Sequence, residues 1–105
     1  MTSMKIIKCL AELMEEELGD AEKYAKLALK YAEEYKDLAD VFHDLSLEEM
    51  KHMQALHDET VDIIADYRKK QGEPPAPMMA VYEYLHEKNI EKAGEVKSLQ
   101  QMYKD

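Results

Sequence analysis

The 105-residue sequence has few residues that break helices and a single cysteine. It contains three glycines and three prolines, and all three prolines fall within residues 72–77 together with Gly72. Cys9 alone cannot form an internal disulfide, a zinc knuckle or an iron centre with four cysteine ligands. Such sparse cysteine usage fits a reducing compartment.

Positive charge and long apolar runs are also scarce. Lys and Arg number 14 against 23 Asp and Glu, which gives a formal charge of −9 and disfavours nucleic acid or an anionic membrane as partner. No apolar stretch approaches the roughly 20 residues that span a bilayer, and residues 1–8 lack the hydrophobic run of a signal peptide. We therefore expect a soluble cytoplasmic protein. Its acidity suits cation binding, although solubility alone would also explain it.

The apolar residues recur with the period of an α-helix, which predicts an all-α fold. Three segments carry the pattern, at about residues 3–34, 37–71 and 78–103, and we expect them to form one domain. Their apolar stripes are Ile6, Leu10, Leu13, Met14, Ala21, Tyr24, Ala28 and Tyr31 in the first segment; Leu38, Val41, Phe42, Leu45, Met53, Leu56, Thr60, Ile63 and Tyr67 in the second; and Met78, Val81, Tyr82, Leu85, Ala93, Val96, Leu99 and Tyr103 in the third.

Short connections between these segments predict an antiparallel bundle of three long helices. We place a tight link near residues 34–37, with Asp37 as the helix N-cap, although one continuous helix is an alternative. Gly72 is typical of a helix end, and residues 73–77 then form a stiff non-helical connector. Three helices make a thin core for their length, so we expect a two-fold dimer or a multiple of it.

Three polar residues interrupt the apolar stripes. Glu17 lies on the first, whereas Glu49 and His52 lie one turn apart on the second and point the same way. Burying a carboxylate beside an imidazole is costly unless something offsets their desolvation, and a metal ion commonly does. Singly, Glu17 is a tolerated polar residue and His52 a satisfied core histidine. Together the three favour a metal site.

The segment Glu17-Leu-Gly-Asp-Ala-Glu-Lys-Tyr24 resembles the first-helix motif of ferritin-like and rubrerythrin-like proteins. Glu49-Met-Lys-His52 resembles their second-helix Glu-x-x-His, and the resemblance covers roughly the first two-thirds of the chain. The resemblance implies a dinuclear iron site with Glu49 as bridging ligand and Glu17 and His52 as terminal ligands. It also implies that Tyr24 lies beside these ligands and shares in the chemistry.

The chain departs from full-length ferritins and rubrerythrins, which have four bundle helices and a second ligand set in the C-terminal half. Its third segment does contain Glu83-Tyr-Leu-His86, but Glu83 lies far from the apolar stripe and His86 on its flank. We expect this pair to be solvated. A short chain with half a site is more similar to encapsulated ferritins, in which dimerisation completes a four-helix metal core.

The resemblance implies that the protein oxidises Fe(II) with oxygen or peroxide. One alternative is a non-redox protein that holds Mn, Zn or Ca at the same ligands, since affinity alone does not select the metal. Another is a non-catalytic helical oligomerisation or interaction module. Off the stripe, His43 and His57 are expected to be exposed, and Glu48 and Glu59 at its edge are candidate outer carboxylates.

Overall fold

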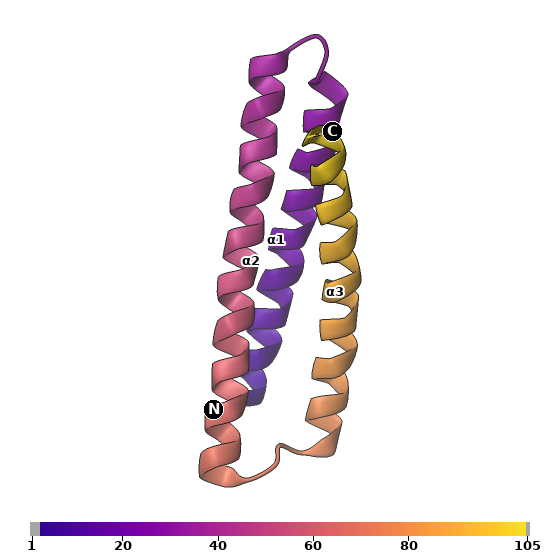
Figure 1. Ribbon diagram of the computed structural model, residues 1–105. Helices are drawn as coiled ribbons and strands as arrows, with labels where there is room; N and C mark the ends of the chain where they lie inside the picture. Colours follow the sequence, from indigo (N-terminus) through magenta and orange to yellow (C-terminus); the bar gives the residue numbers. More distant parts are fainter. Residues whose placement is uncertain (1–2, 105) are drawn as a thin grey trace.

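The computed structural model describes residues 3–104, which form three helices and no strand (Figure 1). Helix α1 spans Ser3–Tyr31, α2 spans Lys36–Gln71 and α3 spans Ala76–Lys104. The all-α prediction is confirmed. None of the described helices combines the length and the apolar character that a membrane crossing requires.

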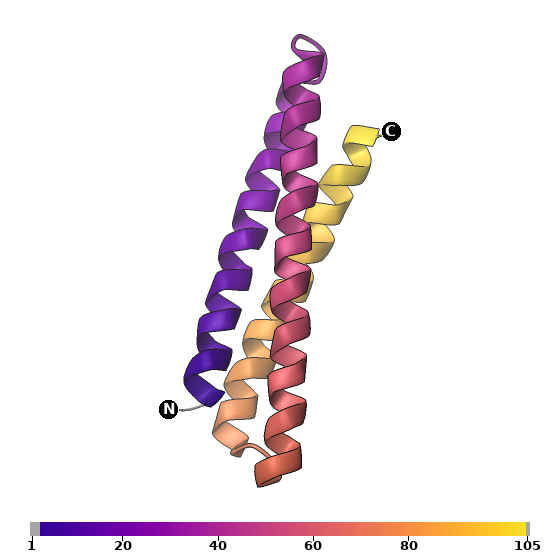
Figure 2. The same ribbon diagram turned by 90° about the vertical axis from the view of Figure 1, so that its left-hand side faces the viewer.

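The three helices form an elongated bundle that measures 56 × 19 × 17 Å. Helices α1 and α3 run in the same direction and α2 runs in the opposite direction (Figure 1). Helix α1 packs against both other helices, whereas α2 and α3 have little contact with each other. Figure 2 shows that α3 is inclined to the α1–α2 pair. Helix α1 is therefore the central element of the fold.

The first connection is tight, as predicted, but it begins earlier than expected. Helix α1 ends at Tyr31 rather than near residue 34, and the N–H of Tyr35 donates to the carbonyl of Tyr31 at 3.0 Å. Tyr35, not Asp37, occupies the N-cap position of α2, without a side-chain cap. Asp37 lies within the first turn, where its charge favours the positive end of the helix dipole.

At the second connection, Gly72 ends α2 as predicted. Its φ of 83° lies in the left-handed region, and its N–H donates to the carbonyl of Arg68 at 3.1 Å. The prediction that residues 73–77 are wholly non-helical is wrong, because α3 begins at Ala76. Pro77 is tolerated in this first turn because its missing N–H would have no partner inside the helix.

Small side chains dominate the packed face of α1. Its buried residues are Ile7, Ala11, Met14, Leu18, Ala21, Ala25 and Ala28. The predicted stripe followed the larger apolar residues, and this is partly wrong: Ile6 is 42% exposed and Leu13 is 39% exposed. Alanines pack here because α1 is covered from two sides and small residues allow both neighbours to approach.

The packed face of α2 is also rotated from its predicted stripe. Ala39, His43, Ser46, Met53, Thr60 and Ile64 are buried, whereas Leu38, Val41 and Leu45 are exposed. In α3, Met78, Asn89, Val96 and Gln100 are buried, and Val81 is exposed. Part of the α1–α2 pair that α3 does not cover therefore carries large apolar residues, namely Ile6, Leu13, Leu38, Val41 and Leu45.

Candidate metal centre

Glu17, Glu49 and His52 meet on the α1–α2 pair. The antiparallel packing of these helices places Glu17 of α1 beside the turn of α2 that carries the other two side chains. One ligand atom from each residue lies within 4.8 Å of the others. The His52 Nδ1 atom is 3.4 Å from Glu17 Oε2 and 3.5 Å from Glu49 Oε1. The three residues singled out by sequence are thus close enough to bind one ion.

The cluster opens to solvent on one side. The Glu17 and Glu49 side chains are 26% and 18% exposed, and the His52 side chain is 56% exposed. The prediction that His52 lies in the core is therefore wrong. The prediction rests on a stripe that also contains Leu45, and Leu45 is exposed as well.

The negative charges of the Glu17 and Glu49 carboxylates repel each other. A hydrogen bond with the Glu17 carboxyl, partial burial and the Glu17 charge together raise the pKa of Glu49 to about 7, and His52 opposes this shift. The Glu17 Oε2 atom is buried and has no hydrogen-bond partner in the described structure. It lies 3.4 Å from His52 Nδ1, and this contact is an ion pair rather than a hydrogen bond. A cation would relieve both the repulsion and the unpaired oxygen.

This donor set suits a first-row divalent metal. Two carboxylates and one imidazole match the preferences of iron and manganese, and zinc accepts the same groups. They form half of the ligand set of a di-metal centre in a helical bundle. Within residues 3–104 this is the only group of three or more His, Cys, Asp or Glu with such geometry.

The other residues suggested by sequence have contacts of their own or lie on the surface. The Tyr24 ring stacks on Phe42, with ring centres 6.2 Å apart. Glu83 is exposed as expected, whereas His86 is half-buried, and neither belongs to a group of three or more such ligands among residues 3–104. Glu48 is exposed and pairs with Lys51 at 3.6 Å, and Glu59 is also exposed.

Sequence reasoning missed a polar contact between α2 and the end of α3. His43, expected to be exposed, is only 7% exposed, and its ring stacks on Tyr103 at 4.7 Å. The Tyr103 hydroxyl bonds to Asp40, which also pairs with Lys36 at 2.9 Å. The sequence gives one sign of this burial: His43 follows Phe42 and so lies at the edge of the apolar stripe.

A second buried contact joins all three helices. The Ser46 hydroxyl donates to the Ala21 carbonyl at 2.7 Å and accepts a hydrogen bond from the Gln100 amide at 2.9 Å. The one sign of this contact in the sequence is that Gln100 falls on the apolar stripe of the third segment.

Comparison of the chain with protein-family models, curated proteins and solved structures gives no significant match. The fold and the cluster therefore define the class of protein: a three-helix bundle that carries a carboxylate–histidine group on one open face.

Proposed function

We propose that this protein is a ferritin-like iron protein that oxidises Fe(II) with oxygen or peroxide at a site shared by two copies of the chain. The observation that carries the proposal is the convergence of Glu17, Glu49 and His52 on the face that α3 leaves open. A site that needs more ligands than one chain supplies would lie on such a face.

A two-fold axis beside the cluster would double its ligands to four carboxylates and two imidazoles. The α1–α2 pairs of both copies would then form a four-helix core around the metal, in an isologous interface. Exposed apolar residues on this face support such an interface, because burying them gains about 25 cal/mol per Å². They include Leu13, Leu38, Val41 and Leu45.

In this proposal iron is the substrate. Two Fe(II) ions give up two electrons, and oxygen takes these and two protons to become hydrogen peroxide; peroxide taken as oxidant becomes water in the same way. The carboxylates of Glu17 and Glu49 neutralise the charge of the ions, and His52 supplies nitrogen. Because the pKa of Glu49 is raised to about 7, metal binding at neutral pH should release a proton from this group.

The exposed apolar face also favours a second candidate, a non-catalytic oligomerisation module. Such a protein would dimerise through the same surface, but iron and chelators would leave its thermal stability unchanged. A non-redox Mn or Zn protein would bind metal without consuming oxygen.

The test loads the purified chain with Fe(II) and measures metal per chain, oxygen consumption and molecular mass in solution. We expect Glu49→Gln and His52→Ala to lose iron binding and oxidation. Glu48→Gln is the matched control, because Glu48 is an exposed neighbour outside the cluster, and it should behave as wild type. Iron binding by Glu49→Gln and His52→Ala at the wild-type level would refute the proposal.

A further inference from the structure

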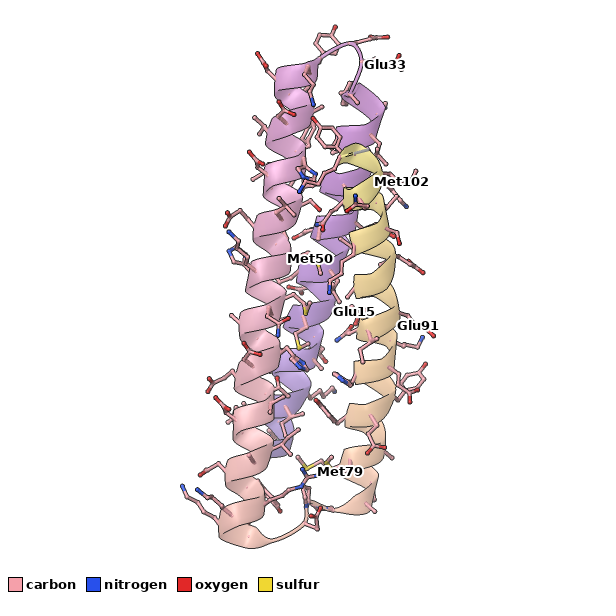
Figure 3. All side chains as sticks on the ribbon, in the orientation of Figure 1. Glu15, Glu33, Met50, Met79, Glu91 and Met102 are labelled. Atoms are coloured by element: carbon pink, nitrogen blue, oxygen red, sulfur yellow. The ribbon has the colours of Figure 1, made fainter. Side chains whose placement is uncertain are left out.

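A separate cleft of about 400 Å³ lies between α2 and α3. It forms because both helices pack on α1 and have little contact with each other. Met14 and Met53 line it and, with Leu18, make a buried cluster between the helices. Met50, labelled in Figure 3, packs against the same cluster.

Two histidines from different helices meet in this cleft. The rings of His57 on α2 and His86 on α3 lie 5.2 Å apart, with 13° between their planes. Both are half-buried, so the expectation that His57 is exposed is wrong. His86 also stacks on Tyr82, which limits the freedom of its ring. The pair is thus held where α2 and α3 face each other.

A third polar residue lines the cleft close to His86. Asn89 follows His86 by three positions on α3, lines the cleft and is only 9% exposed. Its side-chain amide offers the cleft one carbonyl oxygen and one NH₂ group.

We propose that His57 and His86 chelate a divalent metal ion of the imidazole-binding class, such as Zn²⁺ or Ni²⁺, with the Asn89 amide oxygen facing the same ion. At a tetrahedral ion with bonds of about 2.0–2.1 Å, two imidazole ring centres lie roughly 5 Å apart. The observed separation of 5.2 Å matches this value, and binding requires the rings to turn out of their stacked arrangement so that one nitrogen of each faces the ion.

The chemistry of the cleft differs from that of the Glu17–Glu49–His52 cluster. No carboxylate is among the described residues that line it, so its donors are imidazole and amide groups, which suit zinc or nickel. Lys97 also lines it but lies eleven positions from His86, about 16 Å along the helix, where screening weakens its repulsion. An ion in the cleft would join α2 to α3 and fix the inclined helix.

The test uses the full chain carrying Glu17→Gln, Glu49→Gln and His52→Ala, which removes the other cluster. Zn²⁺ alone is titrated by calorimetry, and we expect one ion per chain. Adding His57→Ala or His86→Ala should weaken binding at least tenfold. Gln54→Ala is the control, since Gln54 lines the same cleft without belonging to the donor group, and it should leave affinity unchanged.

A second measurement requires neither the His57→Ala nor the His86→Ala substitution. In the triple variant three histidines remain, at positions 43, 57 and 86, and Zn²⁺ should shift the NMR signals of His57 and His86 but not of His43. Absence of zinc binding, or equal binding without either histidine, would overturn the inference. Absence of iron oxidation by the wild-type chain, with zinc binding intact, would count against the proposed function alone.

Discussion

His52 Nδ1 lies 3.4 Å from Glu17 Oε2, which joins a solvent-facing imidazole on α2 to a carboxylate on α1 whose oxygen is buried and lacks a hydrogen bond. At this contact, α1 and α2 bring their ligand side chains together on the side of the cluster that is open to solvent. Its electrostatics can be tested without any metal.

Replacing Glu17 should restore the ordinary acidity of its neighbour. Because the Glu17 carboxyl is the largest cause of the raised pKa of Glu49, Glu17→Gln should move that pKa from about 7 toward its usual 4.5. An NMR titration of the metal-free protein measures this. Asp20→Asn is the control and should have a smaller effect, since Asp20 is the weakest contributor.

The raised pKa of Glu49 also predicts how the stability of the metal-free protein depends on pH. Unfolding returns the pKa from about 7 to 4.5, so the folded state holds the proton more tightly. This contribution is fully present below pH 4.5 and is lost as pH rises to about 7. Glu49→Gln should remove this loss and raise the free energy of unfolding at pH 8 by about 1 kcal/mol. Urea titrations at pH 5 and 8 with chelator would show it, and an unchanged pH dependence would contradict the assignment.

A charge on the open face should weaken self-association. Val41 is 53% exposed on α2 and belongs to this face, so Val41→Lys should raise the dissociation constant of the dimer about tenfold or more by desolvating a charge. Val81→Lys is a matched control, because Val81 is 56% exposed on α3. Both variants should stay within about 0.5 kcal/mol of wild-type folding stability. Sedimentation equilibrium distinguishes them; equal effects would place the interface elsewhere.

Two leucines of α1 test the orientation of the core. Leu18 is 0% exposed and contacts Met14 and Met53, so Leu18→Ala should lower the free energy of unfolding by about 2–5 kcal/mol. Leu13 is 39% exposed, and Leu13→Ala should cost less than about 1 kcal/mol in the monomer. Chemical denaturation at a concentration that keeps the chain monomeric measures both. Similar losses for the two variants would show that the face of α1 is assigned wrongly.

The sequence predicted the helices well because their signals are local. Periodicity marked all three, and Gly72 marked the end of α2, since only its backbone readily adopts a φ of 83°. The Glu49–His52 pair was equally visible, because residues three apart share a helix face whatever packs against it.

The packed faces were harder to predict because they depend on partners distant in sequence. On α1, Ala21 and Ala25 are buried while Leu13 is exposed, because α1 is packed between two helices. The buried Gln100 is satisfied by Ser46, 54 positions away, and no local pattern encodes such a partner. The same limit concealed the meeting of His57 and His86 in the cleft.

The unequal packing of the bundle has a consequence for its dynamics. Helix α3 makes fewer contacts with the other two helices than they make with each other, so it can separate from them by breaking its packing on α1 and a few side-chain contacts with α2, such as Gln100–Ser46. Such opening leaves Glu17, Glu49 and His52 together, since all three lie on α1 and α2. Backbone amides of α3 should therefore exchange with deuterium sooner than those at the centre of α1, as a separate cooperative unit.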